Sequence, residues 1–301
     1  MSDPVLTEEP LQFGDGGRLF GILTLPSMSH RKAPGLPVFV FLNAGLLHRV
    51  GPRRLYVHLA RDLSRMGFSS LRVDLAGIGD SPPRPGLTNQ QSVAADYDEI
   101  LRVLESRLAR VPLILAGLCS GADNAIRLAP KDSRVVGLVL LDPVCSPDDG
   151  FSARAFVSKY TNTARYVAWL KRRFEAPTTQ PRGSQEQIDP LTLRDAPTLE
   201  QLRDAPLEQL RSAFESIRER DGRVLSVFTQ YALQYYNQAG QLARVLGVAG
   251  YQQFCTELFW PQAEHTYTLE LHRRRLIDAI KTWAGGFIRS RIDVTRNIGT
   301  D

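Results

Sequence analysis

Short apolar segments of strand length alternate with longer amphipathic segments over the first half of the chain. Continuous apolar runs, typical of strands buried on both faces of a sheet, occur at residues 38–42, 113–118 and 135–141, and a further strand is predicted at residues 71–75. Apolar residues recur at helical spacing over residues 54–66 and 92–109, and a glycine-rich turn within residues 11–26 indicates a hairpin. Strands that alternate with helices in this way predict a mostly parallel sheet with right-handed crossovers.

The alternation stops after Gly150 and resumes near residue 221. Residues 151–174 have a helical pattern and residues 175–190 are rich in polar residues, proline and glycine. Strands are predicted again at 224–228 and 253–259, with helices at 242–248 and 268–288 and a loose polar tail after Arg289. We therefore predict a core built from residues 1–150 and 221–301, with a helical cap at residues 151–220.

Composition and charge narrow the class of protein. The chain has 301 residues and a net charge of +5, with arginines scattered among carboxylates, so we expect no nucleic-acid partner. No stretch approaches the roughly 18 apolar residues of a membrane span, and the acidic N-terminus lacks the features of a signal peptide, so a cytoplasmic location is expected. Three cysteines at no metal-ligand spacing predict neither a disulfide framework nor a metal site, and no cofactor is expected.

The strand at residues 113–118 passes directly into a helical pattern through the sequence Gly117-Leu-Cys119-Ser-Gly121. The two glycines allow the strand and the helix to approach closely, which would hold Cys119 in a strained conformation with its side chain projecting from the sheet edge. Cys119 is therefore the candidate nucleophile, whereas Ser120 lies one position too late. The alternative is an ordinary turn with a buried cysteine, which is common for free thiols.

This segment resembles the nucleophile elbow Gly-x-Ser-x-Gly of the α/β-hydrolase family, with cysteine in place of serine. Residues 74–81, Asp-Leu-Ala-Gly-Ile-Gly-Asp-Ser, resemble the Asp-x-x-Gly-x-Gly-x-Ser stretch after the fourth strand of many members, where the aspartates shape the loop. The resemblance implies an α/β-hydrolase fold, with a mostly parallel central sheet flanked by helices and an inserted helical cap. Together with Asn-Ala-Gly at residues 43–45, the chain is most similar to hydrolases associated with exosortase or with polysaccharide and natural-product gene clusters. A cysteine elbow also occurs in dienelactone hydrolases and polyhydroxyalkanoate synthases.

The resemblance also implies the partners of the nucleophile. The family places its histidine on the loop after the last strand, where His265 lies. Its usual acid follows the strand at 224–228, but residues 222–256 contain no Asp or Glu. One branch of the haloalkane dehalogenases places the acid after the preceding strand, which indicates Asp142 here. The amide of Asn237 is the rival orienting group, since cysteine and histidine can work with an amide.

The oxyanion hole implied by the family consists of the backbone N–H groups of Ser120 and Leu46. His48, Arg49 and Asn237 are candidate substrate-binding residues, the first two because they could hold an anionic group.

These residues predict a cysteine-dependent hydrolase that acts on an ester or thioester, free or carrier-bound, through an acyl-enzyme. A thioester intermediate can also pass its acyl group to an alcohol or amine, so an acyltransferase or cyclase is the second hypothesis. The third is a binding protein that keeps the fold without catalysis, which the missing acid after residue 228 would favour. The sequence predicts no particular acyl group and no oligomeric state.

Overall fold

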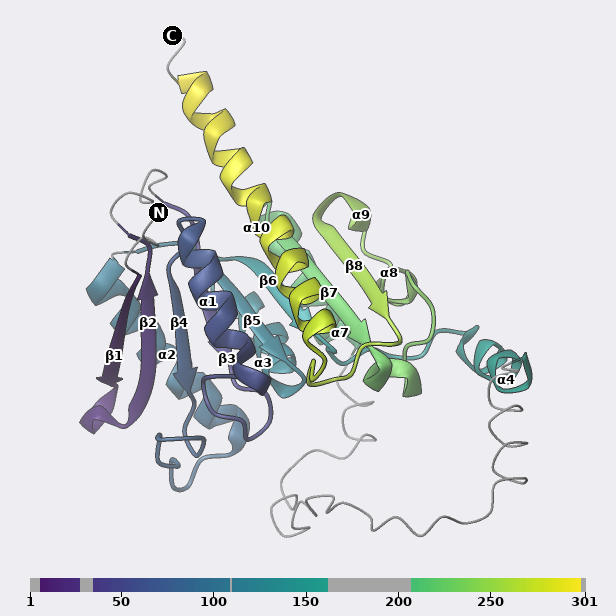
Figure 1. Ribbon diagram of the computed structural model, residues 1–301, viewed down its shortest axis with the longest axis horizontal. Helices are drawn as coiled ribbons and strands as arrows, with labels where there is room; N and C mark the ends of the chain where they lie inside the picture. Colours follow the sequence, from purple (N-terminus) through teal and green to yellow (C-terminus); the bar gives the residue numbers. More distant parts are fainter. Residues whose placement is uncertain (1–5, 28–34, 109, 162–206, 299–301) are drawn as a thin grey trace.

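The computed structural model of the protein describes residues 6–27, 35–108, 110–161 and 207–298, with side chains described outside 157–161 and 290–298. Figure 1 shows a central twisted sheet with helices on both faces. The strands are β1 (Thr7–Phe13), β2 (Leu19–Leu25), β3 (Val38–Leu42), β4 (Ser70–Asp74), β5 (Leu113–Leu118), β6 (Val135–Leu141), β7 (Arg223–Thr229) and β8 (Cys255–Trp260).

The eight strands form one sheet in the order β1-β2-β4-β3-β5-β6-β7-β8. β1 pairs antiparallel with β2, and β2 pairs antiparallel with β4. All the remaining pairs are parallel. The predicted fold class is confirmed, and the parallel strands end at one edge, where the loops that follow them meet.

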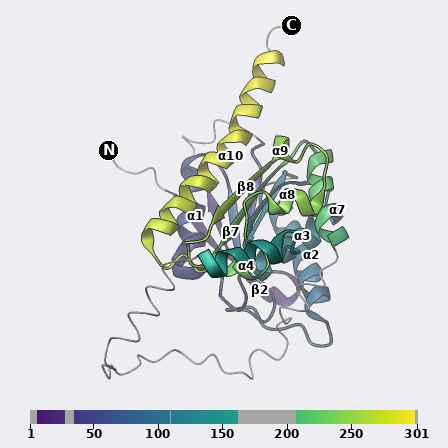
Figure 2. The ribbon, with the colours of Figure 1, turned by 90° about the vertical axis from the view of Figure 1, so that its right-hand side faces the viewer.

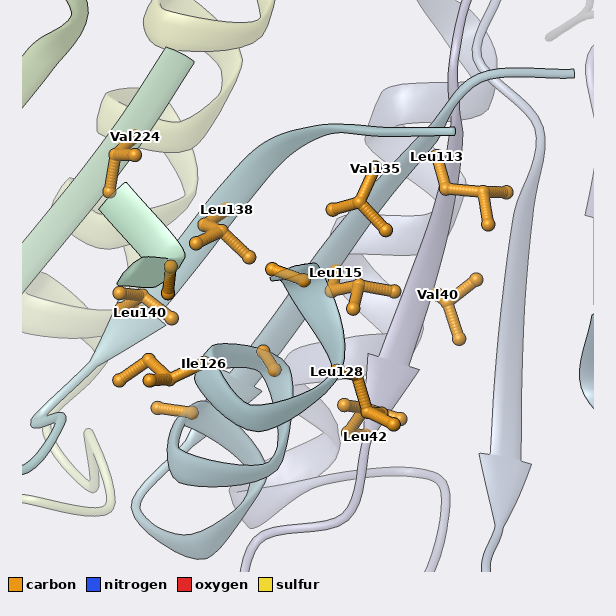
Figure 3. Close-up of a cluster of buried hydrophobic side chains, with 14 of the residues drawn as sticks. Val40, Leu42, Leu113, Leu115, Ile126, Leu128, Val135, Leu138, Leu140 and Val224 are labelled. Atoms are coloured by element: carbon orange, nitrogen blue, oxygen red, sulfur yellow. The ribbon is translucent and has the colours of Figure 1, made fainter. Parts of the chain in front are cut away.

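The three neighbouring strands β3, β5 and β6 are apolar throughout because both faces of the sheet are covered there. Along β3, Val38, Val40 and Leu42 join the hydrophobic cluster on one face, whereas Phe39 and Phe41 join the cluster on the other. Figure 3 shows the first cluster, in which side chains of β3, β5 and β6 meet those of an overlying helix. Because successive side chains of a strand point to opposite faces of the sheet, one apolar strand contributes to both hydrophobic clusters.

The helices form two layers. α1 (Leu55–Arg65) and α10 (Glu270–Ile298) pack on the face that carries Phe39. α2 (Asn89–Leu108), α3 (Ser120–Leu128) and α7 (Leu207–Glu219) pack on the opposite face. Figures 1 and 2 show these layers from two directions. The other α-helices in the described part of the chain are α4 (Phe151–Thr161), α8 (Gln241–Leu246) and α9 (Tyr251–Phe254). Among the described residues, no helix is long and apolar enough to cross a membrane.

Two predictions about helices need correction. α7 packs against α3, β6 and β7 and buries Leu210, Phe214 and Ile217 in the core, so residues 207–219 belong to the layer over the sheet and not to a cap. Of the predicted cap, α4 is described, and residues 162–206 lie outside the described residues. The prediction of a loose tail after Arg289 is wrong in part, because α10 continues to Ile298.

The close approach of α3 to the sheet makes Gly121 a sensitive position. A Cβ atom at this residue would lie 2.6 Å from the carbonyl oxygen of Asn43 and 2.7 Å from that of Leu42. Backbone atoms of β3 and its following loop cannot move aside as a flexible side chain would. We expect Gly121→Ala to lower the free energy of unfolding by about 3 kcal/mol, measured by urea denaturation.

The matched control is Gly285→Ala in α10, where the nearest atom to a new Cβ is the end of the Arg289 side chain at 3.7 Å. Alanine has the higher helix propensity, so this variant should be unchanged or more stable by up to about 1 kcal/mol. Equal stability of the two variants would contradict the close packing at the elbow.

Candidate active site

Cys119 is the single residue between β5 and α3. Its backbone adopts φ 55° and ψ −121°, a region in which residues other than glycine are strained. Its N–H donates to the carbonyl oxygen of Leu141 at 2.9 Å, so the end of β6 holds the turn. The half-buried thiol lies at the N-terminus of a nine-residue helix, where the free N–H groups and the helix dipole favour a negative charge. The thiol of Cys119 therefore lies at the position that the sequence analysis assigns to the nucleophile.

Asp142 directly follows β6, beside the elbow, and is buried. Its backbone also has a positive φ of 46°, and its N–H donates to the carbonyl oxygen of Val227 at 2.8 Å. The backbone N–H of Thr229 donates to Oδ1 at 2.6 Å, and the Thr229 hydroxyl donates to Oδ2 at 2.6 Å. These two hydrogen bonds fix the orientation of the carboxylate, and its Oδ2 faces a neighbouring imidazole.

That imidazole belongs to His265, on the loop between β8 and α10. Nδ1 of His265 lies 2.7 Å from Oδ2 of Asp142, which leaves Nε2 for the thiol of Cys119, and the ring hydrogen-bonds to that thiol. Burial by itself would lower the pKa of His265, but the hydrogen bonds and charges of Asp142 and Cys119 outweigh burial and raise the pKa to about 9. The structure thus brings together the three residues predicted from the sequence.

Two neighbours of this group were missed by the sequence analysis, Thr229 and Tyr231. Thr229 occupies the end of β7, where the family usually supplies its acid, and it holds the carboxylate of Asp142 there instead. Tyr231 stacks on the ring of His265, with ring centroids 4.1 Å apart and planes inclined by 28°. A threonine at a strand end and a tyrosine two residues later form no recognisable motif, so only the tertiary structure reveals them.

The candidate oxyanion donors lie on two loops that are tied together. The hydroxyl of Ser120 accepts the N–H of Gly45 at 2.8 Å, which fastens the loop after β3 to the first turn of α3. Leu46 follows Gly45 and is 70% exposed, so this loop lies at the surface of the protein. The role of Ser120 thus includes a loop contact that the family pattern does not predict.

The structure does not give Arg49 the freedom expected of an anion-binding group. Its guanidinium group pairs with Asp74 and also with Asp80, the latter at 2.7 Å, and its backbone N–H donates to Asp74 at 2.5 Å. Asp74 is fully buried and also accepts a bond from Asn43. Both aspartates shape the loop, as expected, and Arg49 neutralises them. His48, by contrast, is exposed on the same loop.

Asn237 does not orient the imidazole. Its Nδ2 donates to the carbonyl oxygen of Phe151 at 3.0 Å, and its Oδ1 accepts from Nε of Arg154 at 2.9 Å. The residue therefore anchors the start of α4. Asp142 contacts His265 instead. Of the two candidates for the orienting group, the hydrogen bonds therefore favour Asp142 over Asn237.

The order of the strands, with a strained elbow after β5 and a histidine loop after β8, defines an α/β-hydrolase fold. Residues 45–219 match the family described as serine aminopeptidase, S33 (Hydrolase_4), and the chain belongs to this family of α/β-hydrolase enzymes. The matched range contains Cys119 and Asp142, and His265 lies beyond it.

Solved structures are similar over nearly the whole chain. The esterase PF2001 of Pyrococcus furiosus is 12% identical, with a TM-score of 0.56, and the match covers 94% of this chain and 91% of that one. DcsB, solved with a substrate analogue, is 16% identical with a TM-score of 0.53, covering 94% and 100%. Est1E of Butyrivibrio proteoclasticus, solved with ferulic acid, is 15% identical with a TM-score of 0.52, covering 90% and 96%. At such identities the similarity concerns the fold. No curated protein matches the sequence.

Proposed function

We propose that this enzyme is a cysteine-dependent hydrolase of esters or thioesters. Cys119 is the nucleophile, and His265 gives a proton to the leaving group. Asp142 orients the imidazole and stabilises its protonated form. The observation that carries the proposal is a continuous chain of hydrogen bonds. The imidazole of His265 bonds to the carboxylate of Asp142 and also to the thiol of Cys119 at the elbow. Esterases among the structurally similar proteins are consistent with this substrate class.

The protonation of His265 is consistent with cysteine chemistry. Its pKa of about 9, which the hydrogen bond and charge of Cys119 help to raise, keeps the imidazole protonated at neutral pH. A protonated ring cannot remove the proton of a serine hydroxyl, but it is the natural partner of a thiolate. The substitution of cysteine at the elbow and the strongly held Asp142 therefore support the same mechanism.

Acylation begins when Sγ of Cys119 attacks the carbonyl carbon of the substrate. The carbonyl oxygen gains a negative charge, which the N–H groups of Ser120 and Leu46 stabilise, each by about 3 kcal/mol as is typical for such donors. When the intermediate collapses, the bond from carbon to the leaving oxygen or sulfur breaks and His265 gives its proton to the leaving group. The products of this half-reaction are a thioester on Cys119, a neutral imidazole and a free alcohol or thiol.

Deacylation restores the starting state. Neutral His265 takes a proton from water as the water attacks the thioester, and the Cys119 thiolate leaves. An alcohol or amine can replace water in this step, which gives acyl transfer or cyclisation. Product masses, measured after incubation with an acyl thioester in the presence and absence of an amine acceptor, distinguish hydrolysis from transfer.

Selective alkylation tests the proposal against a non-catalytic binding protein. Burial raises the pKa of the Cys145 and Cys255 thiols, and the charge of Glu257 raises both further, so both stay protonated at neutral pH. Cys119 lies beside an imidazolium and a helix N-terminus. We expect iodoacetamide at pH 7 to alkylate Cys119 at least about tenfold faster than either other cysteine.

Peptide mapping by mass spectrometry at successive times gives the three rates. The control is Cys119→Ser, which should lose the rapid phase and keep the slow labelling of the other two cysteines. Similar rates at all three positions would contradict an activated thiol and would favour the binding protein.

A further inference from the structure

Tyr231 lies where the polypeptide leaves β7 and enters the short 3-10 helix Gln230–Gln234. The hydroxyl of Thr229 accepts the N–H of Tyr231 at 3.3 Å, so the residue that holds Asp142 also fixes the backbone of Tyr231. The N–H of Gln230 donates to the carbonyl oxygen of Ala263 at 2.9 Å, which joins this turn to the loop that carries His265. Tyr231 is thus held against the candidate triad by bonds on both sides.

The side chain of Tyr231 contacts both reactive groups. Its ring lies over the imidazole of His265 with a centroid distance of 4.1 Å. Its hydroxyl hydrogen-bonds to Cys119. Burial raises the pKa of Tyr231, and the negative charges of Cys119 and Asp142 raise it further, so the phenol keeps its proton and acts as the donor.

We propose that Tyr231 stabilises the thiolate–imidazolium pair at both ends, with its hydroxyl donating to Sγ of Cys119 and its ring face covering the cation of His265. This inference rests on the proposed function. A hydrogen bond to a charged acceptor is stronger than one between neutral groups, and the face of an aromatic ring attracts a cation. Both effects favour the ion pair over the neutral thiol and imidazole.

The other titratable groups around Cys119 and Tyr231 are the same in every Tyr231 variant. They are His265 and Asp142, the Asp123 carboxyl in the first turn of α3, and the Tyr56 hydroxyl, which accepts the N–H of Leu118 and donates to Leu42. The Asp123 carboxyl is buried, which raises its pKa to about 6, so it becomes charged over the same range and its contribution must be held constant. A comparison of variants at Tyr231 alone meets this condition.

The experiment measures the rate of Cys119 alkylation by iodoacetamide from pH 5 to pH 10 in Tyr231→Phe and Tyr231→Leu. Phenylalanine keeps the stacked ring and removes the donor, so the pH profile should move up by about one unit, with alkylation about tenfold slower on its rising part. Leucine removes both contacts and should move the profile further. It should also lower the pKa of the His265 ring, followed by NMR, more than phenylalanine does.

Tyr251→Phe is the matched control, because it removes a tyrosine hydroxyl that bonds to Glu257 and not to the triad. Its alkylation profile should be that of the wild-type protein. A profile unchanged in both Tyr231 variants, with or without a uniform loss of activity, would overturn the inference and leave the proposed function intact. A wild-type Cys119 that reacts no faster than Cys145 would overturn both.

Discussion

Replacing Cys119 by alanine is expected to reduce kcat/KM on a p-nitrophenyl ester and on an acyl thioester by at least about 10⁴-fold. In the proposed mechanism, Sγ of Cys119 forms the acyl-enzyme, and no other nucleophile lies on the strained turn between β5 and α3 in the described structure. Intact-protein mass spectrometry should detect an acyl adduct on the wild-type protein and none on the variant. The fold should persist, because alanine occupies less space than cysteine at a half-buried position.

Cys119→Ser gives a sharper result than alanine. A serine hydroxyl needs a neutral imidazole as its base, whereas Asp142 favours the protonated form of His265. We expect activity below about 1% at pH 7 that increases with pH as the ring loses its proton.

Two further variants serve as controls for the nucleophile. Cys255→Ala changes a thiol on β8 that takes no part in the proposed reaction, and it should keep wild-type activity. Ser120→Ala keeps the backbone N–H and loses only the bond to Gly45, so it should lose no more than about tenfold. An inactive Ser120→Ala with an active Cys119→Ala would identify the neighbouring serine as the nucleophile instead.

Asp142→Asn is expected to lower kcat by about 10³- to 10⁴-fold, because the amide cannot stabilise the imidazolium and favours the wrong tautomer of the ring. The amide also fits its site poorly. The N–H and hydroxyl of Thr229 both donate to the carboxylate, and an amide offers one acceptor oxygen where two are used.

The charge of Asp142 also sets the pH range over which kcat/KM and the stability of the fold change. In the proposed mechanism, acylation uses the proton of His265, so wild-type kcat/KM should fall as the pH rises through about 9. Without the charge of Asp142, the fall should begin nearer 6.5, the ordinary value for histidine. Because the folded-state pKa is raised, protonation of His265 stabilises the fold fully below pH 6.5, and this contribution is lost as the pH rises to about 9. The stability difference between wild type and variant should shrink over the same interval.

Initial rates and urea denaturation across pH 5–10 measure both effects. Asp123→Asn is the matched control, since it replaces another buried carboxyl near the site and keeps an oxygen to accept the N–H of Val144. It should lose no more than about threefold in kcat. If the Asp142→Asn variant kept the wild-type rates and the same fall of kcat/KM at high pH, another group would have to stabilise the protonated imidazole.

The strands and most helices could be predicted because their signals are local. The apolar run of β3 was predicted at the residues where it forms, and β4 and β8 differ by one or two residues at their ends. The sequence places the residues of α7 in the predicted cap because an amphipathic helix has the same pattern whether its apolar face meets a sheet or a lid. Only its contacts with α3, β6 and β7 distinguish the two.

The sequence by itself determined the elbow, the histidine on the last loop and the absence of an acid between residues 222 and 256. Each depends on residues that are neighbours along the chain, and backbone geometry makes such neighbours predictable. Only the tertiary structure decided that Thr229 holds Asp142, that Asp74 and Asp80 neutralise Arg49, and that Tyr231 covers His265. These pairs are separated by up to 87 residues or lie on different loops, and the folded sheet edge brings them within a few ångströms. Their contacts come from packing, which no local pattern of residues encodes.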